Sequence, residues 1–159
     1  MNYQHAIYRD VAQLLNEALE VRWTDLDRGQ TQRMSQEHPM PMPAVLIGLG
    51  DVQWRTATGK QYGDMELEVS VLLERGQETY VGAEGAAEAL GLLEWQDRVY
   101  EALEEQHGGC WSGMARTWTM KADWQARHVV LRSRWRCTVV QGRPGKDVAL
   151  TGVEVERKR

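Results

Sequence analysis

The first twenty residues carry a helical pattern of hydrophobic positions. Apolar side chains follow one another at steps of three and four residues, and polar side chains fill the positions between them. The apolar set is Ile7, Val11, Leu14, Leu15 and Ala18. The sequence therefore predicts an amphipathic helix over residues 5–19.

Later stretches alternate between apolar and polar residues, as half-buried strands do. The alternation is cleanest over residues 64–74 and is repeated over residues 126–141. Residues 44–54 form an apolar run interrupted by glycines, and residues 111–122 alternate more weakly. We expect four strands that pair in chain order as two hairpins.

A second helical stripe covers residues 84–106 and stops at Gly108 and Gly109, which are typical of helix ends. The order of elements is then helix, hairpin, helix, hairpin. This order predicts an α+β fold, with a mainly antiparallel sheet of about four strands and two helices packed on one of its faces.

The segment over residues 26–43 has few apolar residues and holds three of the four prolines, so we expect a long loop there. A short strand could begin before it, at Val21 and Trp23. The polar residues 142–159 predict a short C-terminal extension. Because 159 residues suit one hydrophobic core, we expect a single domain over 1–159. No run is long enough to span a bilayer, so we expect no membrane contact and a protein made in the cytoplasm.

Charge is unevenly distributed along the chain, whose net charge is −4. Residues 64–105 carry twelve acidic and two basic side chains, a net charge of −10, and residues 113–143 carry seven basic and one acidic, a net charge of +6. On the sheet face away from the helices we expect an acidic row and a basic row: Asp64, Glu66 and Glu68, and Arg132, Arg134 and Arg136. These rows pair across strands within one subunit or meet between subunits, and both interpretations stay open.

Catalytic motifs are absent from the sequence. It contains no GxSxG, no HExxH and no Walker loop, and the four histidines lie far apart. The acidic face of residues 84–106 has no histidine partners and no second carboxylate helix, so it is typical of a solvated surface. We expect no catalytic residue, no metal site and no cofactor. Cys110 and Cys137 lack metal-binding spacing, which favours buried free thiols.

Arginine and tryptophan occur together late in the chain, a combination that binds single-stranded nucleic acid in other proteins. Arg127, Arg132, Arg134 and Arg136 lie close in sequence to Trp118, Trp124 and Trp135. Against this interpretation, the chain is acidic, with a pI near 5.6, and has no RNA-binding motif. A small α+β nucleic-acid-binding module that uses the arginine-rich strand is therefore the alternative function.

The order of these segments resembles a known family. The segments are HAIYRDVAQLLNEAL, MPAVLIGLG, GDMELEVSVLLE, AAEALGLLEWQDRVYEALEEQ and HVVLRSRWRCTVV. Together they are similar to the tail terminator or tail completion proteins of long-tailed bacteriophages, which share their fold with minor tail and neck proteins. The resemblance covers most of the chain but has no short signature motif, so no residue role is carried over.

This resemblance implies a structural protein of the virion rather than an enzyme. Such proteins form a ring, typically of six subunits, at the head-proximal end of the tail tube, where they end tube polymerisation and allow the head to join. The implied partners are further copies of the chain, the tail tube protein and a head-completion or connector protein. Genomic DNA would pass through the ring without sequence recognition, and assembly would take place in the host bacterial cytoplasm.

Candidate interface residues follow from the charge rows and from the loops. For a subunit or partner contact they are Asp64, Glu66, Glu68, Arg132, Arg134, Arg136, Arg127, Trp118 and Trp124. Loops that a scaffold holds in place often carry partner contacts, which predicts docking through residues 30–43 and 56–62. The candidates there are Arg33, His38, Lys60 and Tyr62.

Overall fold

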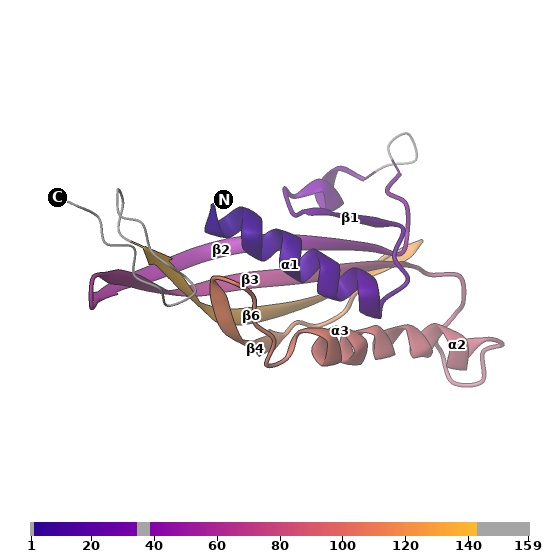
Figure 1. Cartoon of the computed structure of the whole chain (residues 1–159). Coiled ribbons are helices and arrows are strands. Elements are labelled where there is room, and N and C mark those ends of the chain that lie inside the picture. The colour runs from indigo at the N-terminus through magenta and orange to yellow at the C-terminus, as the bar shows by residue number, and fades with distance from the viewer. Residues whose placement is uncertain (1, 35–38, 143–159) are drawn as a thin grey trace.

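A computed structural model describes residues 2–34 and 39–142 (Figure 1). Its helical elements are α1 (Tyr3–Ala18), the 3-10 turn η1 (Gln30–Arg33), α2 (Ala86–Gly91), the 3-10 turn η2 (Leu92–Glu94) and α3 (Trp95–Leu103). Its strands are β1 (Trp23–Leu26), β2 (Ala44–Ala57), β3 (Lys60–Glu74), β4 (Trp111–Thr119), β5 (Asp123–Trp124) and β6 (His128–Gly142). The predicted extension over 142–159 and the docking residue His38 lie outside the described residues, apart from Gly142.

The strands form one mixed sheet in the order β1-β2-β3-β6-β4, with the short β5 paired to β6. β1 runs parallel to β2, and the other pairs are antiparallel. β3 and β6 pair along their whole length, from Lys60 opposite Gly142 to Glu74 opposite His128. These two long strands lie side by side in the middle of the sheet (Figure 1).

The expected four-stranded antiparallel sheet with helix-hairpin-helix-hairpin order is wrong, because the sheet has six strands and is mixed. The short strand suggested at Val21 and Trp23 is present as β1, but its four residues show too little alternation for it to have been counted in the sheet. Its parallel pairing with β2 is continued by Arg22 N, which donates to Pro43 O at 2.7 Å, and by Asp27 N, which donates to Ile47 O at 2.9 Å. The segment expected as a loop over 26–43 is therefore the crossover that parallel neighbours require.

The first helix is confirmed, and the second is divided. α1 begins after Asn2, whose side-chain Oδ1 accepts a hydrogen bond from Gln4 N at 2.7 Å. Residues 84–106 do not form one helix: α2, η2 and α3 follow one another from Gly85, which has a left-handed backbone. No helix in the described part of the chain is long and apolar enough to cross a membrane.

The main core lies between the helices and one face of the sheet, which we call the helix side. Ile7, Val11 and Leu15 of α1 pack there with Val99 and Leu103 of α3. From the sheet come the odd-numbered apolar residues of β3 and β6, which are Met65, Leu67, Val69, Val71, Leu73, Val129, Leu131, Trp135, Cys137 and Val139. The alternation predicted for residues 64–74 and 126–141 is confirmed.

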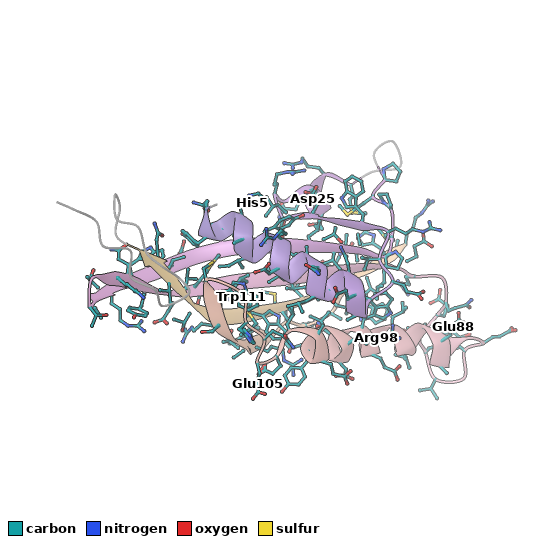
Figure 2. All side chains as sticks on the ribbon, in the orientation of Figure 1. His5, Asp25, Glu88, Arg98, Glu105 and Trp111 are labelled. Carbon is teal, nitrogen blue, oxygen red and sulfur yellow. The ribbon has the colours of Figure 1, made fainter. Side chains whose placement is uncertain are left out.

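A polar link crosses the edge of this core. Trp111, which lies inside the molecule in Figure 2, donates from Nε1 to the Asp10 carboxylate at 2.9 Å and so joins β4 to α1. Gly108 lies against both groups, and a Cβ there would collide with the Trp111 indole and the Asp10 carboxylate. This link needs glycine at position 108.

The opposite face of the sheet, which we call the outer face, carries the even-numbered residues of β3 and β6. One end of it is covered, since Met34, Met40 and Met42 from the crossover pack on a small second core. That core consists of Ala44, Leu46, Leu72 and Val130. The crossover therefore leaves only the middle and the far end of the outer face open.

At that far end, β2 and β3 continue past the helices as an arm, residues 52–65, in which β3 stays paired with the end of β6 (Figure 1). The turn is shorter than the sequence predicted, because Ala57 already pairs with Lys60 and the tip residues Thr58 and Gly59 both have positive φ. Tyr3 meets Trp54 edge to face, with ring centroids 5.4 Å apart, and this contact fixes the start of α1 to the arm.

Candidate assembly interface

The acidic and basic rows lie on neighbouring strands of the outer face. In the register of β3 with β6, Glu66 is opposite Arg136 and Glu68 is opposite Arg134. Asp64 is opposite Thr138 and pairs instead with Arg55 of β2, at 3.3 Å. Some of the acidic and basic side chains that are far apart in the sequence are therefore paired within one subunit.

Glu68 is the centre of the ion pairs on this face. Its carboxylate lies 3.9 Å from Arg132 Nε and 3.5 Å from Arg134 Nε, and Arg132 also reaches Asp123 at 3.6 Å. These side chains are between 26% and 55% exposed. Pairs of this kind contribute about 0.2–1 kcal/mol each, so they stabilise the subunit only slightly.

Glu66 and Arg136 behave differently, although they are direct cross-strand partners. Both are exposed, and neither forms an ion pair with any described residue. Opposite charges at such positions usually attract one another. Here no described residue compensates either charge.

Trp118 joins this row from the edge strand β4, where its register partner is Arg134. Its side chain is 61% exposed, which is unusual for an indole. The outer face therefore places a large aromatic surface beside the exposed Arg134 and Arg136. We call Glu66, Arg134, Arg136 and Trp118 the outer patch.

Two other candidates lie elsewhere. Trp124 is half-buried on β5, packs against the helix-side core and has Arg75 5.8 Å above its ring. Arg127 lies in the turn before β6, where its carbonyl accepts a hydrogen bond from Arg75 N at 2.9 Å. The structure does not bring either residue to the outer patch.

Beside the patch is a shallow, open depression with an acidic rim, lined by Asp27, Gly48, Leu49, Gly50, Asp51, Glu66, Leu67, Glu68 and Arg134. Gly50 is required here, because a Cβ would lie 2.7 Å from Glu66 O. Within residues 2–34 and 39–142, no group of three or more histidine, cysteine or acidic side chains is arranged to hold a metal ion.

The docking residues that the structure describes are in two places. Lys60 and Tyr62 lie on the outer side of the arm, with the Arg55 guanidinium 5.8 Å above the Tyr62 ring. Arg33 ends η1 and donates to Arg28 O at 3.2 Å. The arm and the crossover are therefore two separate exposed elements.

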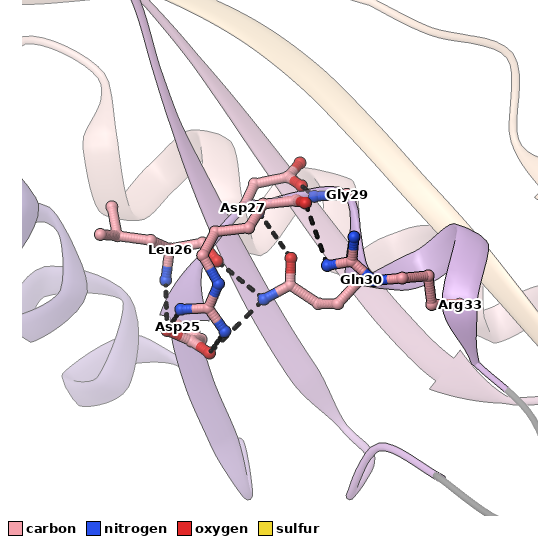
Figure 3. A network of polar contacts seen from close by, with 7 residues as sticks. Asp25, Leu26, Asp27, Gly29, Gln30 and Arg33 are labelled. Carbon is pink, nitrogen blue, oxygen red and sulfur yellow. Dashed lines mark hydrogen bonds and ion pairs between the residues drawn. The ribbon is translucent and has the colours of Figure 1, made fainter.

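A polar network that the sequence analysis missed holds the start of the crossover (Figure 3). The Asp25 carboxylate accepts from Leu26 N at 2.8 Å and from Arg28 Nη2 at 3.2 Å, and Asp27 accepts from Gly29 N at 2.9 Å. Gln30 Nε2 donates to Leu26 O at 2.8 Å. The signal was the DLDRG spacing, because Asp side chains commonly bond the backbone one or two residues later in turns.

Both thiols are poorly suited to chemistry. Burial, with a smaller contribution from the nearby Cys110, raises the pKa of the Cys137 thiol to about 12. Burial, together with the Asp10 carboxylate, also raises the pKa of Cys110. Because the thiolate is the reactive form, both groups react more slowly near neutral pH than an ordinary thiol. Cys137 is buried as expected, whereas Cys110 is partly exposed.

Comparison with known proteins gives a limited result. No protein-family model matches the chain, and no curated protein matches it. Among solved structures, the chain is similar to one from the virion of a native gene transfer agent particle, with 16% identity and a TM-score of 0.47. The similarity covers 85% of this chain and 96% of the other. At this level the function has to be argued from the residues themselves.

Proposed function

We propose that this chain is a structural protein of a phage-like virion. In this proposal it forms a ring at the head-proximal end of a tail tube, ends polymerisation of the tube and allows the head to join. The virion setting comes from the resemblance of the chain to tail terminator and tail completion proteins. The geometry contributes the surfaces through which such a protein would bind its neighbours.

The outer patch is the observation that carries the proposal. Glu66 and Arg136 face each other across β3 and β6, yet they form no ion pair with a described residue. Trp118 on β4, opposite Arg134, is 61% exposed. Aromatic and arginine side chains are enriched at protein interfaces, and unpaired charges give a contact its register and partner choice. The tail tube protein and the connector protein are the partners this proposal assigns to the patch and the arm.

The arm adds reach. Residues 52–65 extend past the helices, and Arg55 and Tyr62 form a cation–aromatic contact on the outer side. A paired hairpin of this kind is stiffer than a loop, so it loses little conformational freedom when it binds. We assign to it a contact with a protein stacked above or below the ring.

Deletion of the gene in a particle-producing strain tests the proposal. Gradient-purified material should then contain tails of uncontrolled length or heads without tails, as counted by electron microscopy. Complementation with the wild-type chain serves as the control and should restore joined particles. Normal particles from the deletion strain would rule the proposal out.

The alternative function, binding of single-stranded nucleic acid, is favoured by one observation: Trp118 lies beside Arg134 and Arg136. The acidic rim of Asp27, Asp51 and Glu66 would repel a phosphate backbone approaching the same surface. Mobility shift over a range of salt concentrations separates the two functions. Binding with a steep salt dependence that is lost in Arg134→Ala/Arg136→Ala would favour the alternative.

A further inference from the structure

Two opposite margins of the molecule have complementary character. α1 covers β1 and β2, whereas α3 contacts β6 and β4, so β1 and the α2–α3 segment lie at opposite sides of the sheet. Figure 2 shows Asp25 at the upper margin and Glu88 and Arg98 at the lower one. Both margins lie toward the end of the sheet away from the arm.

The lower margin, which we call the acidic flank, is the exposed side of α2, η2 and α3. Leu90 and Leu93 are one helical turn apart and are 45% and 39% exposed. The same segment carries exposed acidic side chains at Glu88, Glu94 and Asp97, none of which forms an ion pair with a described residue, and one exposed arginine, Arg98, which lies over the Trp95 ring. Among the described residues, Leu90 and Leu93 belong to neither apolar core of the subunit.

The upper margin, which we call the basic groove, is a hollow beside β1. It is lined by Trp23, Asp25, Arg28, Gln30, Arg33, Met34, Pro39, Met40 and Pro41. Trp23 is 45% exposed, and Arg28 and Arg33 are exposed at its rim.

The groove carries two exposed arginines and one half-buried carboxylate. Asp25 accepts a hydrogen bond from the backbone of its own loop and pairs with Arg28 at 3.2 Å, whereas Arg33 forms no ion pair with a described residue, so the rim has a net positive charge. The network of Figure 3 holds this arrangement before any partner arrives. The groove therefore offers an apolar floor between fixed arginines.

We infer that the basic groove of one copy of this chain receives the acidic flank of the next copy. Leu90 and Leu93 would lie against Trp23 and Met40, and Glu94 and Asp97 would meet Arg28 and Arg33. The inference rests on the proposed function, since it names the subunit contact of the proposed ring. It differs from the pairing of the charge rows, which lie side by side in one subunit.

The occupant is a second copy because the two surfaces match in charge and in apolar content and lie on opposite margins. A contact between different surfaces of identical chains is heterologous, and it closes into a ring when the rotation between neighbours is suitable. The outer patch and the arm lie outside this contact. They stay available to proteins above and below the ring.

Sedimentation velocity on two complementary variants tests the inference. Leu90→Lys/Leu93→Lys disables the acidic flank, and Trp23→Ala/Arg33→Ala disables the basic groove; all four side chains are exposed. We expect wild-type protein to assemble at high concentration and each variant to need about tenfold more protein, or stay monomeric. An equimolar mixture of the two variants should stop at a 1:1 dimer, because only one intact contact remains. Thr56→Lys/Ala57→Lys at the arm tip adds the same charge elsewhere and should assemble like wild type.

A wild-type chain that stays monomeric at the highest concentration, or flank and groove variants that assemble like wild type, would overturn the inference. Near-ultraviolet circular dichroism shows whether each variant keeps its fold. The deletion strain separates this failure from failure of the proposed function. Full rescue of joined particles by both the flank variant and the groove variant refutes the contact and leaves the function standing, whereas normal particles without the gene refute the function.

Discussion

The two faces of the β3–β6 pair differ in burial and in residue type. On the helix side, residues such as Leu131 and Trp135 are about 1% exposed and lie under α1 and α3. On the outer face, the side chains of Glu66 on β3 and Arg136 on β6 are exposed to solvent, although Arg136 directly follows the buried Trp135. Strand geometry alone produces this difference, because successive side chains point to opposite faces.

The comparison separates stability from recognition. Close packing of large apolar groups gives the helix side several kcal/mol per residue, of order 2–5 for a buried large side chain. The partly exposed ion pairs of the outer face give a small fraction of that. Substitutions on the outer face can therefore change partners without unfolding the subunit, and the following substitutions test this separation in order of expected effect.

Replacing Trp135 by alanine should have the largest effect. The side chain is buried, donates from Nε1 to Ser133 Oγ at 2.8 Å and packs near the Tyr100 ring. Its loss should lower the free energy of unfolding by about 3–5 kcal/mol. Urea denaturation measures this. The matched control is Trp118→Ala on the outer face, which should cost about 0.5 kcal/mol or less. Equal losses in both variants would refute the separation of the faces.

Gly63→Ala should come next, because it disturbs the helix side of the arm. The added Cβ would lie 2.5 Å from Val52 Cγ1 and 2.9 Å from the Trp54 ring. Relieving that overlap should cost about 1–3 kcal/mol and loosen the contact of Trp54 with Tyr3. Thermal melts give the loss, and tryptophan near-ultraviolet dichroism gives the loosening. Gly76→Ala has open space around its Cβ and should leave both signals unchanged.

Arg134→Glu should have a small effect on stability and a large one on assembly. The new carboxylate would face Glu68, which lies 3.5 Å from the present guanidinium. The subunit should lose about 1 kcal/mol or less, since the pair is partly exposed. Complementation of the deletion strain with the Arg134→Glu variant should nevertheless yield few joined particles. The yield with Arg134→Gln should lie between those of Arg134→Glu and the wild type. A loss of several kcal/mol with normal particles would show that the outer patch is structural.

Two buried serines give the smallest contrast. Ser133 on the helix side accepts the Trp135 hydrogen bond, whereas Ser70 Oγ on the outer face has no hydrogen-bond partner among the described residues. Ser133→Ala should cost about 1 kcal/mol, because it leaves the indole N–H without an acceptor. Ser70→Ala should be neutral or stabilise by about 0.5 kcal/mol. Chemical denaturation of the two variants in parallel resolves the difference.

Long regular patterns were predictable from the sequence, and short or nonlocal features were not. The alternation through Leu67 and Val69, and the helical steps through Val11, identified elements because many residues share one period. A short strand at Trp23 was suggested by the sequence, but its parallel pairing with β2 was not, because four residues carry no signal of their partner. For the same reason the mixed sheet was missed.

Within the candidate interface, residue types and faces were predictable, but pairing was not. Strand period placed Glu66, Glu68 and Arg134 on one face. That Glu68 binds two arginines while Glu66 binds none depends on register and side-chain reach, which no sequence spacing contains. Sequence spacing also did not show that Trp124, on the short β5 paired to β6, would pack against the helix-side core and away from the outer patch.

The methionines over Leu46, Leu72 and Val130 make one end of the molecule sensitive to oxidants. Met34, Met40 and Met42 cover that small apolar cluster with flexible thioether side chains. Conversion of a thioether to a sulfoxide adds a polar oxygen where only hydrocarbon lies beneath. Treatment with peroxide should therefore detach the crossover from the sheet before the helices lose structure. Methionine sulfoxide reductase should restore the contact between the crossover and the sheet.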